Sequence, residues 1–159
     1  FFVTDSVLRL KSRGGERLLP ITSFYLGRKK LDLRPGELIV EVLVPKAAAA
    51  RKPYYKKVGA RNALAISRVA FAGLLGVEDG RITHLATAYG AVSDTVIRRP
   101  DIDALLVGKT IDEARATRPD FLRAYDEAIV PIRGRISAEY RKDVCMNLLR
   151  DFLDENGIA

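Results

Sequence analysis

The chain has 159 residues, a net charge of +7, 48% hydrophobic and 30% charged residues, a composition typical of a folded globular domain and not of a disordered segment. One cysteine and one histidine exclude an internal disulfide and a metal site built from several such ligands. No apolar stretch is long enough to form a membrane span. With few cysteines and no visible signal peptide, we expect a cytoplasmic protein and, because no initiator methionine is present, a fragment or a processed chain.

Basic residues concentrate in the first part of the chain. Residues 1–61 hold 14 lysine and arginine residues against 5 acidic ones, a net charge of +9, whereas residues 62–159 have a net charge of −2. Such an excess favours an anionic partner, such as nucleic acid, a phosphorylated cofactor or an acidic protein, and it equally fits a solvated basic face. The charge pattern alone does not select among these partners.

The N-terminal residues predict three strands. Val7–Pro20 alternates apolar and polar residues on either side of a glycine-rich turn, which predicts a β-hairpin. Ile21–Leu33 reads as an irregular connector with a basic run. Glu37–Val44 is rich in β-branched residues and stops at Pro45, which predicts a third strand. We place a domain boundary after residue 45, in the alanine-rich linker Lys46–Pro53.

The next segment predicts an antiparallel sheet. Tyr54–Ala60 reads as a strand, and Ser67–Val92 reads as a second hairpin that turns at Glu78-Asp79-Gly80. A further strand is expected around Thr95–Arg98.

After Pro100 the pattern becomes helical. Asp101–Val107 predicts a short helix, and Thr110 and Glu113 fit a capping box. Asp120–Ile129 predicts another helical stretch. Ser137 is a cap for a last amphipathic helix. Strands followed by helices predict an α+β fold, namely an antiparallel sheet of three to four strands with about three C-terminal helices on one face.

The familiar catalytic patterns are weak in this chain. Gly108-Lys109-Thr110 resembles the end of a phosphate-binding loop, but Asp103 stands where that loop needs glycine, so we interpret it as a helix end followed by a helix cap. His84 has no partner pattern of a catalytic triad, and Cys145 lies in a helical stretch, so both are expected to be structural.

Two features keep functional interpretations open. Arg51–Lys57 interleaves basic residues with tyrosines, which suits single-stranded nucleic acid and equally suits a strand that packs its tyrosines. In Lys57–Ser67, Gly59 would let a backbone or a ligand approach closely, and Lys57 and Arg61 could serve a buried anion.

The stretch Lys57–Ser67, K-V-G-A-R-N-A-L-A-I-S, resembles the start of the C-terminal domain in flavoprotein subunits of molybdenum hydroxylases, the family of xanthine dehydrogenase and carbon-monoxide dehydrogenase. Upstream, Phe24–Lys30 and Leu33–Ile39 resemble the family pattern F-x-x-G-Y-R-K-T-x-L-R-P-G-E-L-I, although Arg28 stands where the family has tyrosine. Downstream, Ala88–Val92 and the run into the last helix are similar to the family as well, so the resemblance covers essentially the whole chain.

The resemblance implies part of an FAD-binding subunit of a xanthine dehydrogenase-like oxidoreductase. In such enzymes iron–sulfur clusters receive electrons from a molybdopterin centre and pass them to the flavin. The flavin then transfers them to an acceptor such as NAD. The family pattern implies that Leu38 and Ile39 pack on the isoalloxazine ring, that Lys57 contacts the flavin, and that Arg61 lies near the cofactor. The implied partners are an upstream FAD-binding segment, an iron–sulfur subunit and a molybdopterin subunit.

The same resemblance implies a division of the chain. Residues 1–45 would be the tail of the FAD-binding domain, and residues 46–159 would be the C-terminal domain of the flavoprotein. The family's phosphate-binding glycine loop would lie upstream of Phe1, so we expect that this chain alone does not hold FAD tightly. Two alternatives stay open: a nucleic-acid-binding module that uses the basic N-terminal part, and a scaffold that docks the other subunits without touching flavin.

Overall fold

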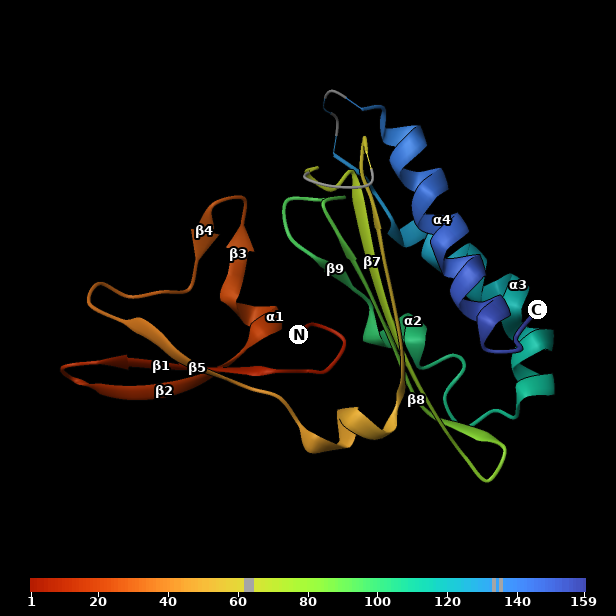
Figure 1. Ribbon diagram of the computed structural model, residues 1–159, viewed down its shortest axis with the longest axis horizontal. Helices are drawn as coiled ribbons and strands as arrows, with labels where there is room; N and C mark the ends of the chain where they lie inside the picture. Colours follow the sequence, from red (N-terminus) through yellow and green to blue (C-terminus); the bar gives the residue numbers. More distant parts are fainter. Residues whose placement is uncertain (62–64, 133, 135) are drawn as a thin grey trace.

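Two lobes follow one another along the chain (Figure 1). The computed structural model describes residues 1–61, 65–132, 134 and 136–159. In the N-terminal lobe, residues 7–44, a three-stranded sheet has the order β2-β1-β5, and a small hairpin pairs β3 with β4. The elements of this lobe are β1 (Val7–Ser12), β2 (Gly15–Pro20), α1 (Ile21–Phe24), β3 (Tyr25–Gly27), β4 (Lys30–Leu31) and β5 (Leu38–Leu43).

The C-terminal lobe, which begins at residue 52, is an antiparallel sheet in the order β6-β7-β8-β9 with helices on one face (Figure 1). A short 3-10 helix, η1 (Lys46–Ala50), joins it to the first lobe. This arrangement confirms the predicted α+β class, its antiparallel sheet and its C-terminal helices. The elements are β6 (Lys52–Val58), β7 (Val69–Glu78), β8 (Arg81–Gly90), β9 (Ile97–Arg98), α2 (Pro100–Asp103), α3 (Ile111–Ala128) and α4 (Ala138–Glu155).

The N-terminal lobe is built on the predicted β-hairpin. Strands β1 and β2 are antiparallel, and Ser12 pairs with Gly15 across a two-residue turn. The connector Ile21–Leu33, which the sequence predicts to be irregular, contains α1 and the β3–β4 hairpin. These elements are two to four residues long, too short for a hydrophobic period to show. The small core of the lobe gathers four buried side chains: Leu8, Leu10, Ile21 and Phe24.

The main core lies between the four-stranded sheet and helices α3 and α4. Phe71 on β7 and Tyr89 on β8 are paired across the strands, face the helices and are fully buried. Gly73 lies two residues after Phe71, on the same face, directly below the ring of Phe152 on α4. A Cβ atom at Gly73 would lie 2.6 Å from that ring, so the missing side chain allows the helix to approach the sheet.

The helix ends follow the capping residues. Thr110 and Glu113 form the predicted capping box, since the Glu113 N–H donates to Thr110 Oγ1 at 3.2 Å and the Thr110 N–H donates to Glu113 Oε2 at 2.8 Å. Helix α3 then continues through Pro119, whereas the sequence predicts a separate helical stretch from Asp120. The proline removes one backbone hydrogen-bond donor, and the packed helix tolerates that loss. Ser137 caps α4 as predicted, accepting from the Tyr140 N–H at 3.1 Å.

A buried polar network ties α2 to the sheet. The Asp103 carboxylate accepts hydrogen bonds from the Tyr125 hydroxyl at 2.7 Å, the Thr87 hydroxyl at 3.0 Å and the Thr87 N–H at 3.1 Å. The Arg98 guanidinium forms an ion pair with the same carboxylate and also lies 3.7 Å from Asp5. The network therefore joins α2, α3, β8 and β9 and reaches the N-terminal segment.

The face of the large sheet that points away from the helices is partly covered by the start of the chain. Val3 is buried there against Ala48 of η1 and against Ala86 and Ala88 of β8. Phe2 packs on the edge of the same cluster. Residues that precede the N-terminal lobe thus lie on the sheet of the C-terminal lobe. The domain boundary at residue 45 stays a prediction.

Candidate functional site

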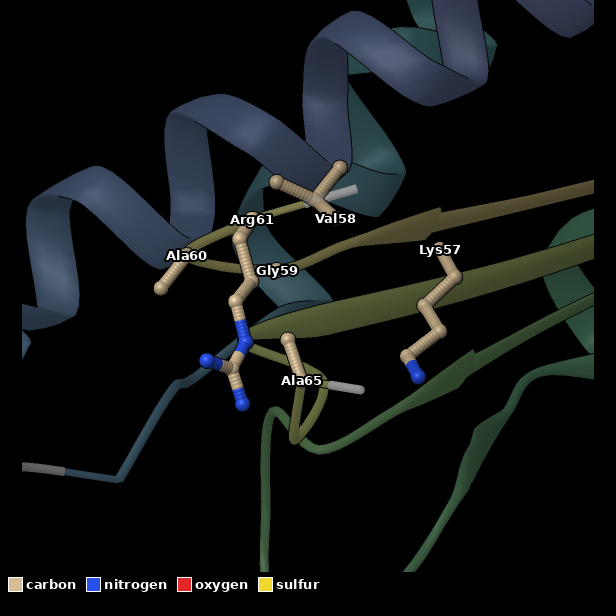
Figure 2. Close-up of a pocket in the computed structure, with 6 residues that line it drawn as sticks. All are labelled: Lys57, Val58, Gly59, Ala60, Arg61 and Ala65. Atoms are coloured by element: carbon tan, nitrogen blue, oxygen red, sulfur yellow. The ribbon is translucent and has the colours of Figure 1, made fainter. Parts of the chain in front are cut away.

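The chain turns at the end of β6, and this turn lines a pocket of about 420 Å³ (Figure 2). All of the lining residues come from the stretch that the sequence analysis singled out. They are Lys57, Val58, Gly59, Ala60, Arg61 and Ala65. Three further residues of that stretch, 62–64, lie outside the described residues.

Lys57 and Arg61 point to the same side of the pocket, and Val58 points toward the helices (Figure 2). Lys57 pairs with Ala70 across the sheet, and Val58 pairs with Val69, which is fully buried. Because successive residues of a strand face opposite sides, Lys57 lies on the face away from the helices. Two cationic side chains therefore share one side of the pocket, an arrangement that attracts an anionic group.

Gly59 lets the chain fold back on itself at the pocket. A Cβ atom at this position would lie 3.1 Å from the Ala65 Cβ and 3.4 Å from the Arg61 carbonyl oxygen. These distances are tighter than a side chain normally accepts, which confirms the predicted close approach at Gly59. The approaching group is the chain itself, and the Arg68 N–H donates to the Val58 carbonyl at 2.7 Å where the strands resume.

Leu38 and Ile39 lie apart from this pocket, on β5 in the N-terminal lobe (Figure 1). Strand β5 is an edge strand, and Leu38 pairs with Lys11 while Ile39 pairs with Leu10. Residues paired directly across an antiparallel ladder share a face, so Ile39 is on the side of the buried Leu10 and Leu38 is on the opposite side. Leu38 is 69% exposed, and Ile39 is about half exposed at 47%. The two side chains therefore meet a common ligand only at the free edge of β5.

A β-bulge follows these residues. Arg9 pairs with Glu41 while the next residue, Leu10, pairs with Ile39, so Val40 has no partner on β1. The bulge returns Val42 to the face of Ile39, since Val42 pairs with Leu8.

An arginine clasp fixes the turn that leads into β5. The Arg17 guanidinium donates to both carboxylate oxygens of Glu37, at 2.8 and 3.0 Å, and to both of Asp32, at 3.1 Å each. The Glu37 carboxylate also accepts the Arg34 N–H at 2.7 Å, and the Glu37 N–H closes the turn on the Arg34 carbonyl at 3.0 Å. The hydrogen bonds that the Glu37 carboxylate accepts, first from Arg17 and then from the Arg34 N–H, lower the pKa of Glu37 from 4.5 to about 2. Sequence reasoning missed the clasp, because its members are 15 and 20 residues apart.

The aromatic and basic run Arg51–Lys57 packs one of its two tyrosines into the core and leaves the other exposed. Tyr54 is buried, with its ring 5.6 Å from that of Phe71 and 5.7 Å from that of Phe152. Lys56 lies over the same tyrosine ring at 5.7 Å. Tyr54 is therefore not accessible to a nucleobase, whereas Tyr55 is 66% exposed on the opposite face of β6, so the packing interpretation holds for one of the two tyrosines.

The remaining candidates are structural. Cys145 is fully buried, and burial raises the pKa of its thiol to about 12, which keeps it unreactive. Burial is also the main cause of a lowered pKa at His84, which packs beside the N-terminal segment. Gly108 has a φ of +84° and precedes the capped helix as predicted, but α2 ends at Asp103, so the predicted helix Asp101–Val107 is replaced by a shorter helix and a turn.

Metal ligands do not gather in the part of the chain that the structure describes. No cluster of three or more histidine, cysteine, aspartate or glutamate residues suits a metal ion there. Within the same residues, none of the helices has the length and apolar character that crossing a bilayer requires.

Comparison with protein families matches residues 54–156 to the model described as CO dehydrogenase flavoprotein C-terminal domain. One curated relative is the glyceraldehyde dehydrogenase medium chain of Sulfolobus acidocaldarius, which is 26% identical over 69% of this chain and 38% of its own length. Another is a putative xanthine dehydrogenase FAD-binding subunit of Escherichia coli, which is 28% identical over 60% of this chain and 33% of its own length. The chain thus spans about a third of these relatives.

Solved structures share the fold. The carbon monoxide dehydrogenase structure from Hydrogenophaga pseudoflava superposes with a TM-score of 0.81 at 22% identity, over 94% of this chain and 52% of its own chain. Quinoline 2-oxidoreductase from Pseudomonas putida superposes with a TM-score of 0.79 at 22% identity, over 98% and 53%. The likeness extends through the N-terminal lobe, which the family match at residues 54–156 leaves out.

Proposed function

Because the chain belongs to the CO dehydrogenase flavoprotein C-terminal domain family, we propose that it is the C-terminal part of the FAD-binding subunit of a molybdenum hydroxylase, an oxidoreductase. In that role FAD receives electrons from iron–sulfur clusters, which in turn receive them from a molybdopterin centre in partner subunits. FAD then passes the electrons to an acceptor such as NAD. This chain would supply one wall of the flavin site, and the rest of the subunit would supply the pyrophosphate loop.

The observation that carries the proposal is the pair of cations at the β6 pocket. Lys57 and Arg61 share one side of a pocket of about 420 Å³, within the segment that matches the family. FAD carries a pyrophosphate, and its reduced ring carries negative charge, so a cationic wall suits either end of the molecule. Gly59 lets the chain fold back closely on itself, and this turn holds the segment that carries the two cations.

The residues present fit the cofactor by chemistry. Lys57 would favour the negatively charged, reduced form of the ring, and Arg61 would hold the cofactor in place. Leu38 and Ile39 would exclude water from one edge of the ring, since their exposed apolar side chains stand at the free edge of β5. The clasp between Arg17 and Glu37 would hold the free edge of β5 in position, because it fixes the turn that precedes this strand.

The test compares two adjacent lysines in the complete FAD-binding subunit. Lys57→Gln removes the cation that lies on the pocket side, whereas Lys56→Gln removes an equal charge from the opposite face of β6. Near a protein surface, where the effective dielectric constant is about 20, one charge beside the ring would contribute on the order of 1–2 kcal/mol, which is about 20–40 mV for a two-electron couple. With salt screening we expect Lys57→Gln to lower the flavin midpoint potential by up to about 20–40 mV.

Spectroelectrochemical titration of the two variants and the parent subunit measures that shift. The proposal requires a clear drop for Lys57→Gln and little change for Lys56→Gln, with FAD bound in both. Equal potentials in all three proteins would place Lys57 away from the flavin. A purified full-length subunit without FAD would contradict the proposed function as a whole.

A further inference from the structure

The β3–β4 hairpin projects from the N-terminal lobe beside the gap between the lobes (Figure 1). Gly27 pairs with Lys30, so Arg28 and Lys29 form its two-residue tip. Lys29 has a φ of +57°, in the left-handed region. Hairpin tips usually place glycine or asparagine in this region, because a longer side chain costs conformational energy there.

The hairpin carries three cations without counter-charges. Arg28, Lys29 and Lys30 are exposed, and within the described residues none of them forms an ion pair. The nearby acids are already engaged, since Asp32 and Glu37 both pair with Arg17. The tip is therefore a concentrated positive charge that the lobe itself does not neutralise.

Apolar side chains flank these cations. Leu26 is 56% exposed, and Leu31 and Leu33 are exposed as well. Apolar side chains surrounded by charges are typical of a protein interface, which buries a small apolar centre inside a polar rim. Tyr25 is 42% exposed and packs its ring edge-to-face with Phe24 at 5.2 Å, whereas the three aliphatic side chains offer a nucleobase no stacking surface. The composition therefore favours protein over single-stranded nucleic acid.

We propose that the β3–β4 hairpin, Tyr25–Leu31, is a docking element for a partner subunit whose surface presents acidic side chains around an apolar patch. The cations at the tip would steer and orient the partner, and Leu26 would be buried by it. The inference rests on the proposed function in one respect, namely that the chain works inside a multi-subunit enzyme.

The experiment uses the complete FAD-binding subunit, tagged and co-expressed with its partner subunits. Arg28→Glu/Lys30→Glu reverses two charges on the hairpin, and Lys11→Glu/Arg13→Glu makes the same change on the exposed β1–β2 hairpin as the matched control. We expect the first variant to bind its partner at least tenfold more weakly at about 50 mM salt and the control to change little, with the difference shrinking at about 0.5 M salt.

A second pair of variants tests the apolar contact. Leu26→Ser alters the proposed interface, and Leu18→Ser alters a leucine of β2 with nearly the same exposure, 58%. Loss of partner with Leu26→Ser alone supports docking through the hairpin. Equal loss in a variant and its control, or full retention by both hairpin variants, overturns the proposal.

Two further readouts separate the remaining outcomes. The FAD content of each purified subunit reports the proposed function independently, so a flavin-free subunit that still loses its partner on hairpin substitution leaves the docking proposal standing. Binding of a fluorescently labelled 20-nucleotide single strand tests the other anionic partner. Loss of strand binding with the subunits still assembled would overturn the docking proposal in favour of nucleic acid.

Discussion

Replacing Asp103 by asparagine is expected to remove a large share of the stability of the C-terminal lobe. The Asp103 side chain is only 2% exposed and accepts hydrogen bonds from Thr87 and Tyr125. Its ion-pair partner Arg98 is 7% exposed. An asparagine of the same shape places an NH₂ group among these donors and leaves the guanidinium without its close counter-charge. Asp5, 3.7 Å from Arg98, is the other acid near it and lies mostly in solvent.

The burial of the pair sets the size of the effect. Breaking a buried ion pair on one side costs about 3–5 kcal/mol, because the remaining charge stays desolvated. Proteins of this size have about 5–15 kcal/mol of stability in total. Each kcal/mol corresponds to about 2–4 °C in melting temperature for a chain of this length, so we expect Asp103→Asn to lower the melting temperature by about 6–20 °C.

The neighbouring ion pair on the same helix provides the control. Asp101 pairs with Arg99, but the two side chains are 61% and 41% exposed. Water screens such a pair, so Asp101→Asn should barely change the melting temperature. Near-ultraviolet circular dichroism follows unfolding through the buried rings of Tyr89 and Tyr125, and no tryptophan interferes. Equal losses for Asp101→Asn and Asp103→Asn, or no loss for Asp103→Asn, would refute the argument from burial.

Two further predictions concern packing and pH. Gly73→Ala places a Cβ atom 2.6 Å from the Phe152 ring and should lower the free energy of unfolding, measured by urea denaturation, by about 1–3 kcal/mol. Gly90→Ala, whose nearest contact would be at 3.6 Å, should leave it almost unchanged. Equal urea midpoints for the two variants would contradict the close approach at Gly73. The pKa of Glu37 is lowered to about 2 by Arg17, so its carboxylate contributes stability that is complete above about pH 5 and is lost as the pH falls from 4.5 toward 2. Glu37→Gln should flatten the acid titration of the N-terminal lobe, followed by NMR, and an unchanged titration would count against the clasp.

Local signals in the sequence predicted the elements that short-range chemistry determines. The capping box at Thr110 and the hairpin at Val7–Pro20 depend on residues within a few positions of each other, and both are confirmed. The short elements between Ile21 and Leu33 were missed because they are too short to show a hydrophobic period, and α1 is held by burial of Ile21 and Phe24 in the lobe core. Helix α3 extends through Pro119 for a similar reason, since packing of its buried face outweighs the loss of one hydrogen bond.

The candidate site was predictable in part. The cations and the glycine of the β6 turn were visible as a motif, and the structure brings Lys57 and Arg61 to one pocket. The opposite orientation of Leu38 and Ile39 follows from the two-residue period of the predicted strand, but the face that each takes and the bulge at Val40 were not visible, because both arise from pairing with β1. The comparison of Lys57→Gln with Lys56→Gln tests the proposed flavin contact of Lys57.

The packing of Val3 on the large sheet gives the N-terminal lobe two attachments instead of one. The chain leaves the large sheet at Val3, builds the lobe, and returns to the same sheet at Ala48, and both residues are buried in one apolar cluster. Both ends of the lobe are therefore held at one place on the large sheet. Lifting the lobe away from that sheet would expose Val3 and Ala48 to water, so their burial favours the arrangement that holds the edge of β5 relative to the turn after β6.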